Sequence, residues 1–348
     1  MLPLRESVRQ TPAYVPGEQP KTLDVIKLNT NESPYPPPAK IFAEIQPELE
    51  KARLYPDPLS TELRKAAANV FGVKANQILA GNGSDDILNI ALRTFVNPGE
   101  TVGFLDLTYS LYQTLAAVHG ANIVHFPTDE QFELTEPINC PEAKLLFLAS
   151  PNPPKGKQIN RELLWQTCAQ ASGIVLIDEA YGDYSDEDHW DFLREFPNVI
   201  ISRTLSKSYS LAGMRVGFAI AAPEIIVEMD KVRDSYNLDR IAQCLGKAAL
   251  DAHADFVPLW QKIRRTRERL EKGLTQLGFK VCESEANFVF ASPQWIEAAQ
   301  LHQRLKAQHI FVRHFRQPRI ENYLRITIGT DEEIDALLAA ITAIKSEC

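Results

Sequence analysis

The stretch "TLSKSYSLAGMRVGF", Thr204–Phe218, places a lysine between two apolar runs that are typical of β-strands. The run "NVIIS" (198–202) precedes it and the run "RVGFAIA" (215–221) follows it. Lysine is ordinarily a solvated surface charge, so Lys207 in this position needs a physical reason. Because Lys207 follows a strand, its amine can project into a crevice at the edge of a sheet. Partial loss of water there would lower its pKa and make it nucleophilic.

The alternation of apolar and amphipathic segments continues on the N-terminal side of this stretch. Seven short apolar runs are separated by segments such as "SDDILNIALRTFV" and "YSLYQTLAAVHG"; the runs are "NQILAG", "TVGFLD", "NIVHF", "KLLFLAS", "GIVLIDE", "NVIIS" and "RVGFAIA". Strands that alternate with helices indicate an α/β fold with a mostly parallel sheet covered on both faces. We assign this seven-stranded large domain to residues 41–245.

The pattern changes after the large domain. A long charged segment (256–279) comes first. Two strand-like runs follow, "KVCESEANFVFA" and "YLRITIG", with a helical segment around "WIEAAQLHQRLKAQH" between them. The chain then continues into a terminal helix, "DEEIDALLAAITAIK". This pattern predicts a smaller C-terminal α+β domain at residues 246–348.

The first forty residues are rich in proline. The hydrophobic and aromatic residues among them, Tyr14, Val15, Leu28 and Tyr35, predict an N-terminal arm (1–40) that packs on the rest of the chain. The alternative is a disordered or polyproline-like tail.

Composition narrows the classes of function. The 348 residues exceed the usual size of a single core, and 37 basic against 45 acidic residues give a net charge of −8. Without a basic stripe, nucleic acid is not an expected partner. The opening "MLPLRESVRQ" has no apolar signal core, and no run approaches the roughly 20 apolar residues of a membrane span, which points to the cytoplasm.

The cysteines and histidines predict neither disulfides nor a metal site. Five cysteines are scattered without a C-x-x-C pair, and we interpret them as reduced thiols: Cys140, Cys168, Cys244, Cys282 and Cys348. The seven histidines form no cluster with ligand spacing.

Two further strand ends carry polar residues, and ligands of open α/β sheets bind beyond the carboxyl ends of strands. In "ILAGNGSDDIL" the glycines Gly81 and Gly83 allow a tight turn, and Ser84 opens a helix whose free N–H groups could hold a phosphate. A purely structural turn is the alternative. In "GIVLIDEAYGDY" the strand delivers Asp178 to its end, where a buried carboxylate needs a positive partner. The alternative there is a helix cap.

The residues around Lys207 suit a phosphate, because Thr204, Ser206 and Arg215 supply two hydroxyls and a fixed cation. An aldehyde cofactor with a phosphate and a ring nitrogen would use Lys207 for a Schiff base and Asp178 for the protonated nitrogen. Pyridoxal 5′-phosphate fits that description. An acyl transferase that uses "TLSK" as a hydroxyl and lysine pair is the competing interpretation, but it explains neither Asp178 nor Arg215.

Seven motifs occur in order over nearly the whole chain: "GNGSDD", "LTYSLY", "SPNPPKG", "IDEAY", "TLSKSYSLAGMRVGF", "EANFV" and "LRITIGT". With them the chain resembles the fold type I pyridoxal-phosphate aminotransferases of class II. The stretches "LNTNESPY" and "YPDP", together with "LRITIGT", are similar to the histidinol-phosphate aminotransferase family. The resemblance implies a homodimer that interconverts L-histidinol phosphate and 2-oxoglutarate with imidazole-acetol phosphate and L-glutamate in histidine biosynthesis.

The resemblance also implies cofactor contacts. Lys207 would form the Schiff base, Asp178 would pair with the ring nitrogen, and Tyr181 would hydrogen-bond the phenolic oxygen. Tyr109 would stack on the ring. The phosphate would be held by the backbone of Ser84 and Asp85, by Thr204, Ser206 and Arg215, and by Tyr55 from the neighbouring subunit.

At the substrate end, the resemblance implies that Arg325 and Arg313 hold the anionic group. Tyr14 of the arm and Asn31 would close the site. The same catalytic set would serve a threonine-phosphate decarboxylase or an aromatic amino-acid aminotransferase, and these remain alternatives. A non-enzymatic sensor of pyridoxal phosphate is a further alternative, but the chain has no helix-turn-helix extension.

The chain departs from the family pattern in two places. Where the family often has Asn-Asn-Pro-Thr-Gly, this chain has "NPPKG", with Pro153 and Lys155 in place of the second asparagine and the threonine. Asn152 is therefore the only asparagine of this motif for the phenolic oxygen. Lys207 is followed by "SYS", where alanine, an aromatic residue and glycine are common.

Overall fold

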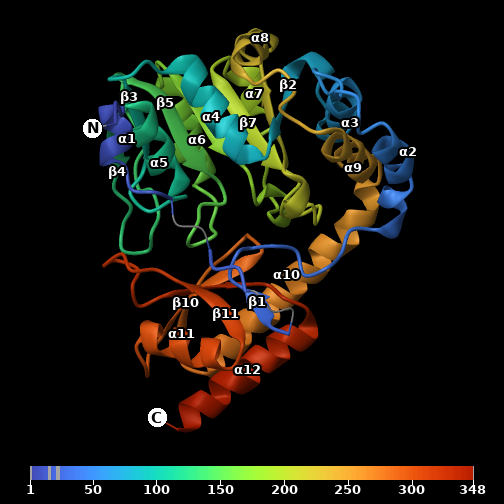
Figure 1. Cartoon of the computed structure of the whole chain (residues 1–348). Helices are drawn as coiled ribbons and strands as arrows, with labels where there is room; N and C mark the ends of the chain where they lie inside the picture. The colour runs from blue at the N-terminus through green and yellow to red at the C-terminus, as the bar shows by residue number, and fades with distance from the viewer. Residues whose placement is uncertain (1, 15–16, 21–23, 348) are drawn as a thin grey trace.

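The computed structural model describes residues 2–14, 17–20 and 24–347 of the chain. Val15 and Cys348, named above, lie outside the described residues. An upper part is built on a seven-stranded sheet and a lower part on a five-stranded sheet (Figure 1). The long helix α10 (His253–Gln276) runs from the upper part down along the lower one.

The seven-stranded sheet has the order β2-β8-β7-β6-β5-β3-β4. Its strands are β2 Ile78–Asn82, β3 Thr101–Leu105, β4 Asn122–Phe126, β5 Ala143–Ala149, β6 Ile174–Asp178, β7 Val199–Thr204 and β8 Val216–Ala221. Neighbouring strands are parallel except that β8 is antiparallel to both β2 and β7. Each strand coincides with one of the seven predicted apolar runs. The prediction of a mostly parallel seven-stranded sheet is confirmed.

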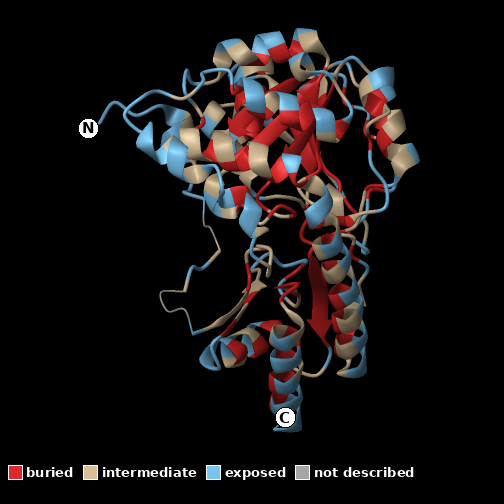
Figure 2. Cartoon of the chain, turned by 90° about the vertical axis from the view of Figure 1, so that its right-hand side faces the viewer, coloured by how far each residue is buried: buried red, intermediate tan, exposed pale blue. Residues whose placement is uncertain are grey.

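Helices cover this sheet on both faces, which explains why its strands are apolar on both sides. Every residue of β7 and β8 is buried. Figure 2 shows the strands of the upper part as mostly buried ribbons between partly exposed helices. The helices of this part are α2 Ile45–Glu50, α3 Thr61–Phe71, α4 Ser84–Phe95, α5 Leu111–His119, α6 Arg161–Gln170, α7 Phe192–Glu195, α8 Pro223–Val232 and α9 Arg240–Asp251, with short 3-10 turns η1 Ala39–Phe42, η2 Ala75–Gln77, η3 Gly182–Tyr184 and η4 Ala212–Met214.

The five-stranded sheet has the order β1-β11-β12-β10-β9. Its elements are β1 Ile26–Leu28, β9 Phe279–Cys282, β10 Phe288–Pro293, β11 Ile310–His314 and β12 Leu324–Thr327, with helices α11 Ala298–Ala307 and α12 Asp331–Ser346. The run "KVCESEANFVFA" is not one strand. It divides into β9 and β10, because the chain reverses between them and the two halves pair antiparallel. The strands β1 and β11 were not predicted from the sequence.

The N-terminal arm contacts both parts. Helix α1 (Glu6–Gln10) packs on α5, where the Arg5 guanidinium donates to the His119 carbonyl at 3.0 Å and the Ser7 hydroxyl to the Val118 carbonyl at 3.1 Å. Further along the arm, β1 pairs in parallel with β11. The described arm is therefore packed rather than detached. The limits 1–40, 41–245 and 246–348 stay a proposal, and residue 245 lies inside α9.

Two observations concern the chain as a whole. Among the helices that the structure describes, none is both long and apolar enough to cross a membrane. Four of the five cysteines lie in the described part and carry free thiols: Cys140, Cys168, Cys244 and Cys282.

Gly217 on β8 allows a close approach between its strand and the backbone of Gly83 and Ser84 at the start of α4. A Cβ atom at this position would overlap the carbonyl carbon of Gly83 and the amide nitrogen of Ser84. We expect Gly217→Ala to lower the free energy of unfolding by about 1–3 kcal/mol, the usual cost of overpacking. Urea denaturation measures this loss. Gly213→Ala, where a Cβ meets nothing within 4 Å, is the matched control, and equal stability of the two variants would contradict the argument.

Candidate active site

The site lies where β6 and β7 end side by side, since Asp178 is in register with Ser202. The Asp178 side chain is almost fully buried, and its residue is 3% exposed. The Tyr112 hydroxyl donates to one carboxylate oxygen at 2.8 Å, but the other oxygen has no hydrogen-bond partner among the described residues. Burial raises the pKa of Asp178 to about 6, against the opposing hydrogen bond from Tyr112. This orphaned oxygen marks a place for a donor from outside the chain.

Lys207 lies three residues beyond the end of β7. Its Nζ donates to the Thr30 carbonyl at 3.2 Å and lies 6.0 Å from the centroid of the Tyr181 ring. Burial lowers the pKa of Lys207 to about 8. The charges that act on its pKa are Arg325 and Arg215, which lower it, and Glu32 and Asp85, which raise it. A lysine in this state is a usable nucleophile near neutral pH.

The start of α4 lies close to Thr204, Ser206 and Arg215, and we call this group the anion cradle. Gly83 precedes helix α4 with a φ of 83°, and a Cβ there would overlap the Arg215 guanidinium. Arg215 donates to the Ser206 hydroxyl at 3.2 Å and to the Asp85 carboxylate at 3.2 Å, while the Ser206 amide donates to the Thr204 hydroxyl at 3.1 Å. The first turn of α4, two hydroxyls and a guanidinium therefore lie together, which is the chemistry of a phosphate site.

Two tyrosines border the space between the cradle and Lys207. The Tyr109 hydroxyl donates to Asp85 at 3.1 Å, and its ring packs edge-on against Tyr112 at 5.6 Å. The Tyr181 hydroxyl accepts a hydrogen bond from the Asn31 side-chain amide at 2.9 Å. Burial raises the pKa of both tyrosines, so each hydroxyl keeps its proton at neutral pH.

The lower sheet contributes two neighbouring arginines. Arg325 on β12 is in register with Arg313 on β11. The Arg325 guanidinium donates to the Asn29 carbonyl at 3.1 Å and lies 5.3 Å from the centre of the Phe288 ring. Its Nε has no hydrogen-bond partner among the described residues, and burial lowers its pKa. A half-buried cation with an unused, buried Nε donor is suited to an anionic ligand.

Three predicted site residues lie at the margin or have other partners. Tyr55 is 76% exposed and stacks on Tyr236 at 4.4 Å. The Asn152 amide donates to the Leu107 carbonyl at 2.9 Å, and its oxygen accepts from Thr108 at 2.6 Å. Tyr14 is partly exposed, although it acts electrostatically on Tyr109. The roles implied for Tyr55, Asn152 and Tyr14 stay predictions.

Three residues that shape the site were not singled out from the sequence: Asn287 and Thr327, which contact the predicted residue Asn31, and Tyr112, which contacts Asp178. Asn31 has a left-handed backbone with a φ of 56°, which asparagine tolerates. The Asn287 amide donates to the Asn31 carbonyl at 3.0 Å, and the Thr327 hydroxyl donates to the Asn31 side chain at 3.0 Å. Asn287 lies in the quoted motif "EANFV", so the motif itself was a signal. Tyr112 lies with Tyr109 in the quoted motif "LTYSLY", so that motif was a signal as well.

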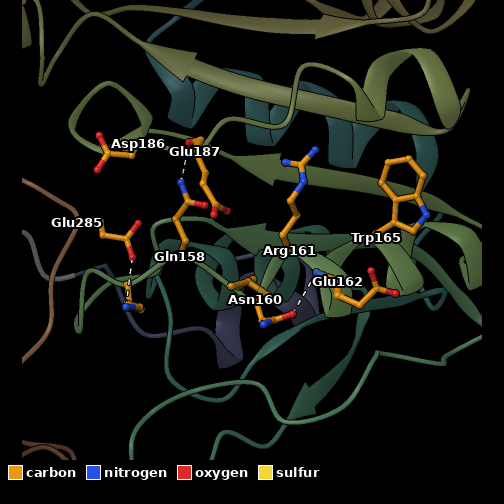
Figure 3. Close-up of a pocket in the computed structure, with 10 residues that line it drawn as sticks. Gln158, Asn160, Arg161, Glu162, Trp165, Asp186, Glu187 and Glu285 are labelled. Atoms are coloured by element: carbon orange, nitrogen blue, oxygen red, sulfur yellow. Dashed lines mark hydrogen bonds and ion pairs between the residues drawn. The ribbon is translucent and has the colours of Figure 1, made fainter.

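A separate open depression of 730 Å³ lies elsewhere on the surface (Figure 3). It is lined by Lys157, Gln158, Ile159, Asn160, Arg161, Glu162, Trp165, Asp186, Glu187 and Glu285. None of these ten is a predicted site residue. We therefore assign the site from the orphaned and perturbed groups and not from this depression.

The sequence of the chain matches a known family of enzymes over most of its length. Residues 23–341 match the family described as aminotransferase class I and II. The chain belongs to this family. A histidinol-phosphate aminotransferase of Synechocystis sp. is 70% identical over 345 residues, which cover 99% of each chain. Another from Geobacter sulfurreducens is 40% identical over 349 residues, covering 99% of this chain and 100% of that one.

Solved structures share the fold. Histidinol-phosphate aminotransferase from Sinorhizobium meliloti, in complex with pyridoxal 5′-phosphate, has a TM-score of 0.88 at 24% identity and covers 100% of this chain and 98% of that chain. The enzyme from Clostridium acetobutylicum has a TM-score of 0.85 at 20% identity, covering 93% and 100%. The resemblance predicted from the motifs, the fold class and the assignment as an aminotransferase are confirmed.

The lowered pKa of Lys207 gives a direct test on this aminotransferase without added cofactor. A small acylating reagent reacts only with the neutral amine, so modification of Lys207 should reach half its maximal rate near pH 8. An exposed lysine titrates near 10.4. Mass spectrometry of the Lys207 peptide across a pH series measures this midpoint. Arg325→Gln should raise it, because the positive charge on Arg325 disfavours a second one. A Lys207 midpoint close to 10 would be evidence against the described environment.

Proposed function

We propose that this chain is a pyridoxal-phosphate-dependent aminotransferase that interconverts L-histidinol phosphate and 2-oxoglutarate with imidazole-acetol phosphate and L-glutamate, in histidine biosynthesis. The observation that carries the proposal is the buried Asp178 oxygen without a partner, at the same sheet edge as Lys207. The substrate is supported by relatives at 65–70% identity over nearly the whole chain, each named histidinol-phosphate aminotransferase.

The residues present fit the cofactor. The orphaned oxygen of Asp178 would accept a hydrogen bond from the protonated ring nitrogen. The phosphate would lie on the first amides of α4, at Ser84 and Asp85, beside the Arg215 guanidinium and the hydroxyls of Thr204 and Ser206. When bound, pyridoxal phosphate supplies an electron sink for the bond that breaks at the substrate carbon. A carboxylate at Asp178 keeps the ring nitrogen protonated, which strengthens that sink.

Lys207 has two tasks in this proposal. Its amine would hold the cofactor through the aldehyde carbon. The same amine would also act as a general base toward the substrate carbon. A pKa of about 8 suits both tasks, because a substantial fraction is neutral at physiological pH while the protonated form is still accessible.

The two arginines of the lower sheet would anchor the substrate. Histidinol phosphate carries a phosphate and no carboxylate, whereas 2-oxoglutarate carries two carboxylates and no phosphate. One pocket must therefore accept both kinds of anion. A guanidinium can bind either group in bidentate fashion, which favours Arg325 as the shared anchor and Arg313 as a further phosphate contact. Asn31 and Tyr14 would close the site, and Tyr181 and Tyr109 would hold the ring of the cofactor.

A homodimer is part of the proposal. Apolar side chains are exposed on and around α2, α3 and α9: Phe42, Leu49, Leu54, Tyr55, Leu59 and Tyr236. An apolar surface of this kind is typical of a contact between proteins. It supports the implied role of Tyr55, which would reach the cofactor phosphate of the neighbouring subunit. The cytoplasmic location and the absence of nucleic acid as a partner are kept as proposals, the latter supported by the net charge of −8.

The first test uses the enzyme loaded with pyridoxal phosphate. Addition of L-histidinol phosphate should convert the visible absorbance of the bound cofactor to that of its amine form, and 2-oxoglutarate should restore it. Lys207→Ala should abolish turnover, because both the covalent attachment and the proton transfer are lost. Lys65→Ala, at an exposed position on α3, is the control and should remain active.

The same experiment separates the alternatives. A threonine-phosphate decarboxylase would release carbon dioxide from threonine phosphate and leave the absorbance unchanged with histidinol phosphate. That result would refute the proposed substrate. An aromatic amino-acid aminotransferase would respond to phenylalanine or tyrosine instead. A sensor would bind the cofactor without turnover.

Separate half-reactions test the arginines. Arg325→Lys should weaken the reactions of both histidinol phosphate and 2-oxoglutarate by roughly 1.5–3 kcal/mol each, the worth of hydrogen bonds to a charged group. Arg313→Ala should impair histidinol phosphate more than the oxo acid. Stopped-flow absorbance of each half-reaction measures kcat/KM, with Arg264→Lys at a partly exposed ion pair as the control. Equal rates for Arg325→Lys and the control would exclude Arg325 as the anchor.

A further inference from the structure

Three residues of the site, Asp178, Thr204 and Lys207, have sequence neighbours that are connected by polar contacts. Glu179 follows Asp178, Arg203 precedes Thr204, and Ser208 follows Lys207. In extended backbone, successive side chains point to opposite sides. The residues next to Asp178 and Thr204 are therefore directed away from the ligand, and both are buried.

These neighbours belong to one continuous set of polar contacts. The Glu179 carboxylate lies 2.6 Å from His189 Nδ1 and accepts a hydrogen bond from Arg203 at 2.8 Å. The other terminal nitrogen of Arg203 pairs with one oxygen of Asp183. The second oxygen of Asp183 accepts a hydrogen bond from the Ser208 hydroxyl. A chain of side chains thus leads from the neighbour of Asp178 to the neighbour of Lys207.

The packing around this chain restricts its movement. The Arg203 guanidinium lies against two mutually stacked rings, 5.7 Å from the centroid of Phe71 and 5.5 Å from that of Trp190. The Trp260 indole donates to the Ser208 carbonyl at 2.6 Å, so both the backbone and the side chain of Ser208 are held. Buried charges that are fully paired resist displacement, because separating them leaves an uncompensated charge.

We propose that the chain Glu179–Arg203–Asp183–Ser208 is a positioning device that fixes the backbone at Lys207 relative to Asp178. This inference rests on the proposed function. The lysine side chain is long and flexible, so the place of its amine depends on where its backbone is held. Lys207 would transfer a proton at one substrate carbon, and the cofactor ring next to Asp178 would accept electrons from the same carbon. The amine must therefore be fixed relative to Asp178. Ser208 is the last link, and it acts on Lys207 rather than on the substrate.

The test compares two serines of the same segment. Ser208→Ala removes the last link and leaves Arg203 paired with both carboxylates, so the variant should fold. Ser210→Ala is the matched control, because the buried Ser210 hydroxyl has no hydrogen-bond partner among the described residues. In the loaded enzyme, Ser208→Ala should lower kcat for histidinol phosphate about tenfold with little change in KM, since a displaced catalytic group loses rate rather than substrate affinity. Ser208→Thr, which keeps a hydroxyl, should restore most of the rate.

Two readouts separate positioning from a merely structural role. The visible circular dichroism of the bound cofactor should change in Ser208→Ala but not in Ser210→Ala. In the cofactor-free protein, the acylation rate of Lys207 at fixed pH should change in the same variant only. Asp183→Asn should lower kcat as well, and the double variant with Ser208→Ala should lose less than the product of the two single losses, because both residues act in one chain.

The outcomes are distinct. If Ser208→Ala matches Ser210→Ala in kcat, dichroism and acylation, the inference is overturned. It is equally overturned if only the melting temperature falls while the folded variant keeps these three values. If the wild-type enzyme fails to convert histidinol phosphate, the proposed substrate is wrong, and the acylation rate of Lys207 still decides the inference about position.

Discussion

The site depends on one electrostatic constraint, the burial of a carboxylate and an amine that the chain itself does not fully satisfy. Asp178 keeps an oxygen without a partner, and Lys207 loses part of its affinity for a proton, in each case mainly because water is excluded. Burying such groups without partners raises the free energy of the folded state. Their presence at one sheet edge is understandable if a ligand completes them, which is why these perturbed groups locate the site.

Arg325 connects the substrate end to this constraint. It is the strongest charge that lowers the pKa of Lys207, and it is itself half-buried, with a buried Nε that has no hydrogen-bond partner among the described residues. An anion bound to Arg325 would neutralise that charge and so favour the protonated form of Lys207. If Arg325 is the anchor that we propose, binding of the substrate anion and protonation of Lys207 would be coupled through charge alone.

Asn31 joins the parts of the molecule at the site. Its side chain contacts Tyr181 of the upper part and Thr327 of the lower part, and its carbonyl accepts from Asn287. The neighbouring Thr30 carbonyl accepts from Lys207. A short segment of the arm thus fixes the distance between the cofactor residues and the arginines of the lower sheet. The strand β1, which places this segment, has only three residues and is held by β11.

The sequence by itself determined the seven strands of the large sheet, and it placed Asp178 and Lys207 at strand ends. Burial on both faces makes such strands continuous apolar runs, so local composition is enough to find them. The tertiary structure alone decided the strand order, the reversed direction of β8, the junction at Asn31 and the chain from Glu179 to Ser208. Asn31 and Thr327 are separated by 296 residues, and β1 is too short to show a period. Contacts between distant segments depend on how the elements pack together, and no local periodicity encodes that packing.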